Sequence, residues 1–148
     1  FHKLASLSWR EWRYLIQAAL LLPFLRLALR GWGFRRVYGL LLRAAPIRND
    51  RSASFTDAEI ASLVRMVDVA ASHGIVRAHC LPRSLAAWWM LRRQGVASEI
   101  RIGVNQQENV FLAHAWVERN GVILNDSDNM HQRFAAFEGP IAPTSWET

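Results

Sequence analysis

The spacing of apolar residues predicts helices in the first half of the chain and strands in the second half. From residue 8 to residue 30 apolar positions recur at helical intervals, with Pro23 placed to bend the helix. A Gly-Trp-Gly break follows, and a second helix is expected over residues 33–44. Residues 44–52 are polar and contain a proline, which is typical of a linker.

The start of the next helix carries the clearest local signal. Thr56 is expected to cap it, and Glu59, three residues later, completes a capping box. Phe55 and Ile60 stand at the two positions of a hydrophobic staple. Apolar residues continue at helical spacing until Gly74, where the helix is expected to stop.

A further helix is expected to begin at Cys80, because Pro82 suits the first turn of a helix and Gly95 suits the position after its end. Cys80 is the only cysteine of the chain. At a helix start, the unpaired amides and the helix macrodipole stabilise a thiolate. The same amides are candidate donors to an oxyanion, although the sequence indicates no second donor from a side chain.

Strand patterns follow this helix. Residues 98–104 alternate apolar and polar side chains, residues 105–109 form a polar turn, and residues 110–118 and 122–126 are expected to be two further strands. Helices followed by an antiparallel sheet make an α+β fold.

The loop between the last two strands decides which side chains share a face of the sheet. A two-residue turn at 120–121 would leave Asp126 on the face opposite His114. A three-residue loop at 119–121, with Gly121 in the left-handed region, would place His114 opposite Asp126 with Cβ atoms about 5 Å apart. The sequence permits both loops. The chemistry discussed below favours the second, so we predict the three-residue loop.

Charge is distributed unevenly along the chain. The net charge is +6, and residues 1–51 hold ten Lys/Arg against two acidic residues, whereas residues 52–148 hold eight against ten. The uncharged run from Tyr14 to Leu25 is shorter than the roughly 20 residues that span a bilayer. The N-terminal helices therefore either pack onto the rest with their arginines in solvent or bind an acidic peptide, a partner protein or a membrane. No nucleic-acid-binding signature accompanies the charge.

Three side chains follow one another in an order that suggests acyl transfer. A thiol at Cys80, an imidazole at His114 and a carboxylate at Asp126 supply a nucleophile, a base and an orienting group. Taken singly, each has a simpler interpretation as a buried apolar residue, a core histidine or a turn cap. His79 is a rival base and Asp128 a rival orienting acid. No CxxC or HExxH spacing indicates a metal site, and we expect neither a metal nor a cofactor.

Four sequence segments resemble the leader peptidase, or B protein, of lasso peptide biosynthesis, which is a transglutaminase-like cysteine protease. The similarity covers residues 74–128 strongly. The segments are Cys-Leu-Pro-Arg-Ser-Leu-Ala from residue 80, Gly-Val-Ala-Ser-Glu-Ile-Arg-Ile-Gly-Val from residue 95, Ala-His-Ala-Trp-Val-Glu from residue 113 and Asn-Gly-Val-Ile-Leu-Asn-Asp from residue 120.

The resemblance implies a papain/transglutaminase-like α+β core over residues 52–148, with residues 1–51 as a basic helical appendage that binds leader or partner. It implies that Cys80 is the nucleophile, His114 the base and Asp126 the orienting acid. Two further residues, outside the triad, are candidates for substrate contacts. Arg83 is expected to pair with a carboxylate or with substrate, and Trp116 either shields the His/Asp pair from water or belongs to the core.

The same resemblance implies proteolysis of a ribosomally made precursor peptide in the cytoplasm. An ATP-dependent, asparagine-synthetase-like cyclase would then close the macrolactam. Residues 1–51 are too short and too poor in strand signals to form a winged-helix recognition domain, so we expect a separate leader-recognition protein. Acyl transfer to an amine and a non-catalytic scaffold for precursor and cyclase are the alternatives. Nucleic acid is not an expected partner, and a membrane is a less favoured one.

Overall fold

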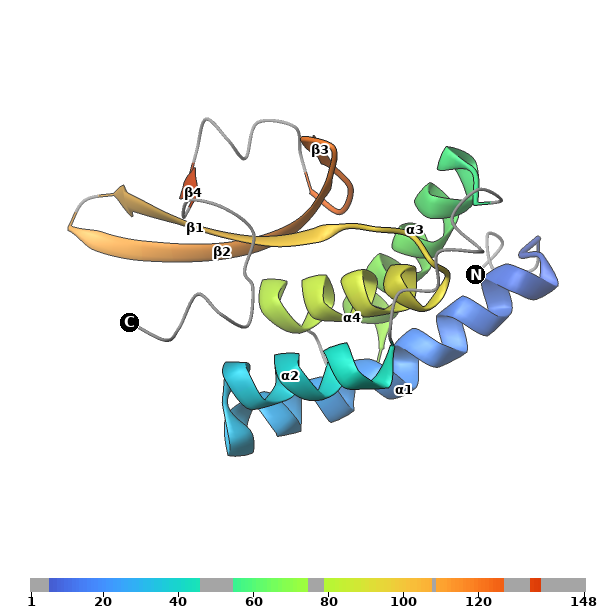
Figure 1. The fold of residues 1–148 in the computed structure, drawn as a ribbon, viewed down its shortest axis with the longest axis horizontal. Helices are drawn as coiled ribbons and strands as arrows, with labels where there is room; N and C mark the ends of the chain where they lie inside the picture. The colour runs from blue at the N-terminus through green and yellow to red at the C-terminus, as the bar shows by residue number, and fades with distance from the viewer. Residues whose placement is uncertain (1–5, 46–54, 75–78, 108, 127–133, 137–148) are drawn as a thin grey trace.

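Helices precede an antiparallel sheet in the part of the chain that the structure describes (Figure 1). The computed structural model describes residues 6–45, 55–74, 79–107, 109–126 and 134–136, so most of the predicted linker lies outside it. The helices are α1 (Trp9–Trp32), α2 (Phe34–Ala44), α3 (Asp57–His73) and α4 (Cys80–Arg93). The strands are β1 (Glu99–Gln107), β2 (Val110–Arg119), β3 (Val122–Ile123) and β4 (Ala135–Ala136).

α1 begins one residue later than predicted and continues through Pro23 to its last turn. The Ser8 side chain accepts a hydrogen bond from the Glu11 amide, and the Glu11 carboxylate accepts one from the Ser8 amide, which completes a capping box. α2 follows directly, because Gly33 adopts a φ of +78° that most residues avoid. By length and composition alone α1 suffices to cross a membrane, a weak criterion that core helices and signal sequences also meet.

α3 and α4 begin where the sequence predicts. Thr56 and Glu59 form the capping box of α3, and Gly74 caps its C-terminal end. Cys80 is the first residue of α4, after His79 as the N-cap residue. The regions of strongest local signal therefore fold as their sequence indicates.

The sheet has the strand order β3-β2-β1-β4, and its described pairings are antiparallel. β1 is longer than predicted, because residues 105–107 continue the strand up to the pair Gln107↔Val110. The predicted polar turn at 105–109 is therefore wrong in its first three residues. Backbone pairing with β2 extends this hairpin without needing apolar side chains. β3 is shorter than predicted and ends at Ile123.

The main hydrophobic cluster joins all four helices to the inner face of the sheet. α4 lies between the sheet on one side and α1 and α2 on the other (Figure 1). Its centre is fully buried, and α1 contributes one face to the same cluster: Ala18, Leu22, Leu25 and Ala28. The basic helices are thus packed onto the rest of the chain. A role of residues 1–51 in binding a leader or a partner stays a prediction.

Candidate active site

The hairpin between β2 and β3 has the two-residue turn, so the predicted three-residue loop is wrong. Arg119 pairs with Val122, and Asn120 and Gly121 occupy the turn with φ values of +51° and +79°. Two successive left-handed residues match the twist of the flanking strands, and Asn-Gly tolerates that conformation better than most dipeptides. The positive φ predicted for Gly121 is confirmed.

His114 and Asp126 nevertheless meet, with His114 Nε2 2.6 Å from Asp126 Oδ2. The regular pairing with β2 ends at Ile123, so the alternation of faces does not extend to Asp126. The Leu124 amide still donates to the Val117 carbonyl at 2.9 Å. The Val117 amide, however, donates to the Asn125 side chain, at 2.8 Å from Oδ1. A side-chain oxygen thus takes the place of a backbone carbonyl as the acceptor of the Val117 amide, and the chain leaves the strand ladder before Asp126.

Asn125 also connects the hairpin to α4. Its Nδ2 donates to Ser84 Oγ at 3.0 Å, and Ser84 Oγ donates to the Ala115 carbonyl at 3.0 Å. Asn125 and Ser84 are both buried, so these bonds satisfy polar groups that water does not reach. Sequence reasoning did not identify this pair. The available signal was a polar residue at an otherwise buried position in each element.

Arg83 contacts the same oxygen of the Asp126 carboxylate as His114 does. Its Nη2 lies 3.3 Å from Asp126 Oδ2 and donates to the Asn125 carbonyl at 3.2 Å. Its Nε lies 3.6 Å from Asp68 Oδ1 of α3, a separation typical of an ion pair but long for a hydrogen bond. Of the two roles expected for Arg83, the structure shows pairing with carboxylates.

Asp68 was not identified from the sequence, where it stands as one acid among the apolar residues of α3. Burial raises the pKa of its carboxyl, and the negative charge of Asp126 raises it further, while the Arg83 guanidinium acts in the opposite direction. α3 therefore contributes a carboxyl group to the surroundings of the His/Asp pair.

The hydrogen bond to Asp126 selects one tautomer of His114. In the neutral imidazole, a proton on Nε2 is donated to the carboxylate, and Nδ1 then carries the lone pair. Because Asp126 is itself held by Arg83, the ring has a fixed partner at Nε2. Nδ1 is the nitrogen that can accept a thiol proton.

Aromatic side chains support the His114 ring from the side of the sheet away from the helices. The Phe134 ring lies 5.2 Å from it and the Trp116 ring 6.3 Å, both nearly parallel to the imidazole. Trp116 is completely buried, and its indole donates to Glu118 Oε1 at 2.7 Å. It presents no surface to a substrate, so its burial favours the core and shielding role over the predicted substrate contact. Gly103, paired with His114, makes room for these rings.

Cys80 is partly exposed at the first position of α4, three residues before Arg83. Residues three apart lie on the same side of a helix, so Cys80 precedes by one turn the residue whose guanidinium binds Asp126. The first helical hydrogen bond of α4 runs from the Arg83 amide to the His79 carbonyl. The earlier amides of the helix have no acceptor within it, and the His79 side chain makes no capping hydrogen bond.

The structure therefore brings together His114, Asp126 and Arg83, and it gives Cys80 the helix start that the sequence predicts. His79 is the N-cap residue of α4. Asp128, the alternative orienting acid, lies outside the described residues.

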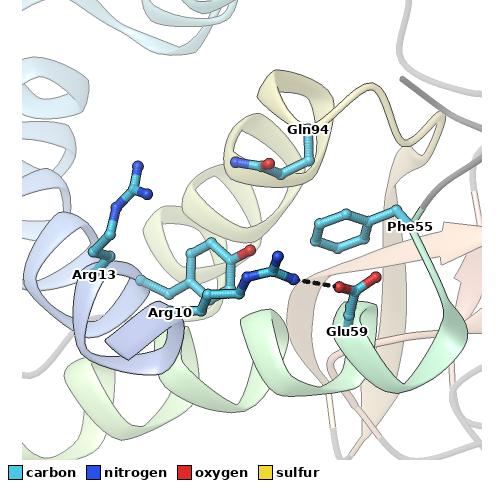
Figure 2. Close-up of a pocket in the computed structure, with 6 residues that line it drawn as sticks. Arg10, Arg13, Phe55, Glu59 and Gln94 are labelled. Atoms are coloured by element: carbon cyan, nitrogen blue, oxygen red, sulfur yellow. Dashed lines mark hydrogen bonds and ion pairs between the residues drawn. The ribbon is translucent and has the colours of Figure 1, made fainter. Parts of the chain in front are cut away.

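A separate cavity of about 370 Å³ lies between the first turns of α1 and α3 and the end of α4 (Figure 2). An ion pair of 2.8 Å between Arg10 Nη1 and Glu59 Oε1 crosses it. Gln94, which also lines it, follows the C-terminal end of α4, whose 14 residues extend about 20 Å from Cys80. The cavity is therefore distinct from the candidate active site.

The chain belongs to the transglutaminase-like superfamily, whose family description matches residues 19–138. The matched region includes most of α1, all other described elements and the three residues Cys80, His114 and Asp126. Membership suggests cysteine peptidase or acyltransferase activity, since the superfamily generally contains enzymes of the cysteine-protease type. No curated protein and no solved structure matches the chain.

Proposed function

We propose that the chain is a cysteine peptidase that removes the leader peptide from a ribosomally synthesised lasso peptide precursor. The observation that supports the chemistry best is the 2.6 Å contact between His114 and Asp126, on a carboxylate also bound by Arg83 of the Cys80 helix. The choice of substrate rests on the resemblance of the segments around Cys80 and His114 to the lasso leader peptidases.

In the proposed reaction, His114 Nδ1 takes the proton of the Cys80 thiol, and Sγ attacks the carbonyl carbon of the scissile peptide bond. Asp126 stabilises the imidazolium, and the backbone amides at the start of α4, which have no acceptor within the helix, donate to the oxyanion. When the C–N bond breaks, the leaving amine receives the proton from His114, and the leader remains as a thioester on Cys80. Water, deprotonated by His114, then hydrolyses the thioester and releases the leader as a carboxylate.

This direction of cleavage leaves the core peptide with a free N-terminal amine. Macrolactam closure requires such an amine as its nucleophile, so the proposed product is the substrate of a separate ATP-dependent, asparagine-synthetase-like cyclase. Delivery of the precursor is assigned to a separate leader-recognition protein, and the reaction to the cytoplasm.

The test is a reconstitution of the purified chain with recognition protein and precursor, followed by mass spectrometry of the products. Cys80→Ala is expected to abolish cleavage while its circular dichroism spectrum stays native. Mature product from a complete reconstitution with Cys80→Ala would instead identify a scaffold. Cleavage in the presence of a primary amine separates the remaining alternative, because an acyltransferase would yield the leader as an amide rather than as an acid.

A further inference from the structure

α1 is apolar on two opposite sides, and only one of them is covered by the described part of the chain. The inner side enters the main core through Ala18, Leu22, Leu25 and Ala28. The outer side carries large exposed residues spaced three or four apart, which places them on one continuous stripe. This outer stripe consists of Trp9, Trp12, Ile16, Leu20, Phe24 and Leu27.

The outer stripe continues into two adjoining cavities between α1 and α2. One is apolar, measures about 370 Å³, and is lined by residues that include Phe24, Trp32 and Leu40. The other measures about 440 Å³ and is lined by Trp32 and Leu40 together with three arginines: Arg35, Arg36 and Arg43. Because the cavities share two residues, an apolar hollow lies directly beside a basic one.

The positive charge of the arginine-lined cavity is not neutralised by the described residues around it. Arg35, Arg36 and Arg43 are exposed, and none takes part in an ion pair within the described ranges. α2 contains no acidic residue, and the one acid of α1, Glu11, is bonded to Ser62 and Arg65 of α3. The surface therefore combines a long apolar stripe with positive charge at one end that the described residues do not compensate.

We propose that the outer stripe of α1 and the arginine cavity of α2 form a peripheral docking surface for an anionic phospholipid bilayer. Tryptophan, phenylalanine and leucine suit the boundary between headgroups and acyl chains, while arginines bind lipid phosphates. The charge complementarity decides for this occupant, since an apolar protein partner would not need three arginines that form no ion pair among the described residues. The inner face of α1 stays in the core, so the helix lies along the membrane surface and does not cross it.

The experiment is co-sedimentation of the full chain with large unilamellar vesicles of phosphatidylglycerol and phosphatidylcholine, compared with phosphatidylcholine alone. The native chain is expected to bind the anionic vesicles and to be released by salt. The double variants Leu20→Asp/Leu27→Asp and Arg36→Glu/Arg43→Glu should each lower the partition coefficient about tenfold or more. Phe111→Asp in β2 is the matched control, because Phe111 is 71% exposed, against 72% for Leu20 and 70% for Leu27.

Native-like binding by both double variants, or no binding of the native chain to anionic vesicles, would overturn the proposal. Self-association in lipid-free solution that only Leu20→Asp/Leu27→Asp abolishes would identify an interface between copies instead. Thermal unfolding of each variant checks its fold, and the arginine pair provides the test if the leucine pair unfolds. Cys80→Ala should bind vesicles as the native chain does, so this result is independent of the proposed peptidase activity.

Discussion

Asn125 offers the sharpest test of how the candidate site is assembled. Asn125→Ala removes the acceptor of the Val117 amide and the donor to Ser84 Oγ, and all three residues are buried. A buried amide left without a partner costs about 1–3 kcal/mol, and the lost bond to Ser84 adds about 1 kcal/mol. The expected loss of stability is therefore about 2–4 kcal/mol.

For 148 residues, a loss in the middle of that range corresponds to a fall in Tm of about 10 °C. Urea denaturation followed by tryptophan fluorescence measures the loss of free energy of unfolding, since the chain has seven tryptophans, and thermal unfolding measures the fall in Tm. Asn120→Gly is the matched control in the same hairpin. Asn120 is exposed and has a φ of +51°, a conformation that glycine adopts readily, so its replacement should change stability by less than about 0.5 kcal/mol.

Asn125→Ala should also lower peptide cleavage at temperatures where the variant remains folded, because Asp126 directly follows Asn125, the residue that ends the strand ladder. Equal urea midpoints for Asn125→Ala and Asn120→Gly would show that the side chain does not hold the hairpin. A destabilised variant with native kcat would show that Asp126 keeps its place without Asn125.

Three further outcomes follow from the site. Iodoacetamide should label Cys80 faster than a model thiol near neutral pH and stop turnover in step with labelling; full activity after complete labelling would exclude it as the nucleophile. Asp126→Asn should keep the native fold and lower kcat by about 10³-fold or more, because an amide cannot stabilise an imidazolium as a carboxylate does; unchanged kcat would remove Asp126 from the mechanism. Gly103→Ala should destabilise the chain by about 1–3 kcal/mol, since a Cβ there would lie 2.8 Å from atoms of Phe134 and Trp116, and native stability would mean that these rings shift freely.

Local signals predicted the helices well, because the start of a helix depends on residues that are close together in sequence. The capping box of Thr56 and Glu59 and the start of α4 at Cys80 were both readable from a few consecutive residues. The same kind of signal was present at Ser8 and Glu11, where the capping box of α1 was overlooked.

The site itself was only partly predictable. The expected contact between His114 and Asp126 exists, but strand alternation does not produce it, because the regular pairing with β2 ends at Ile123. What ends the strand is a side chain bonded to Ser84, and that contact joins elements about 40 residues apart in sequence. Asp68 was missed for the same reason, since its partner lies on another helix.

The contacts around Arg83 also determine the electrostatic balance of the site. At a pH above the raised pKa of Asp68, where both carboxyls are ionised, Asp68, Arg83 and Asp126 together carry one net negative charge while His114 is neutral. A proton arriving on His114 brings the four side chains to zero. In the proposed reaction, proton transfer from the thiol therefore brings the combined charge of these four side chains to zero, and the negative charge moves onto the sulfur of Cys80. In the proposed reaction α3 supplies no reacting atom, but an ionised Asp68 would in this way favour the ion pair that precedes attack.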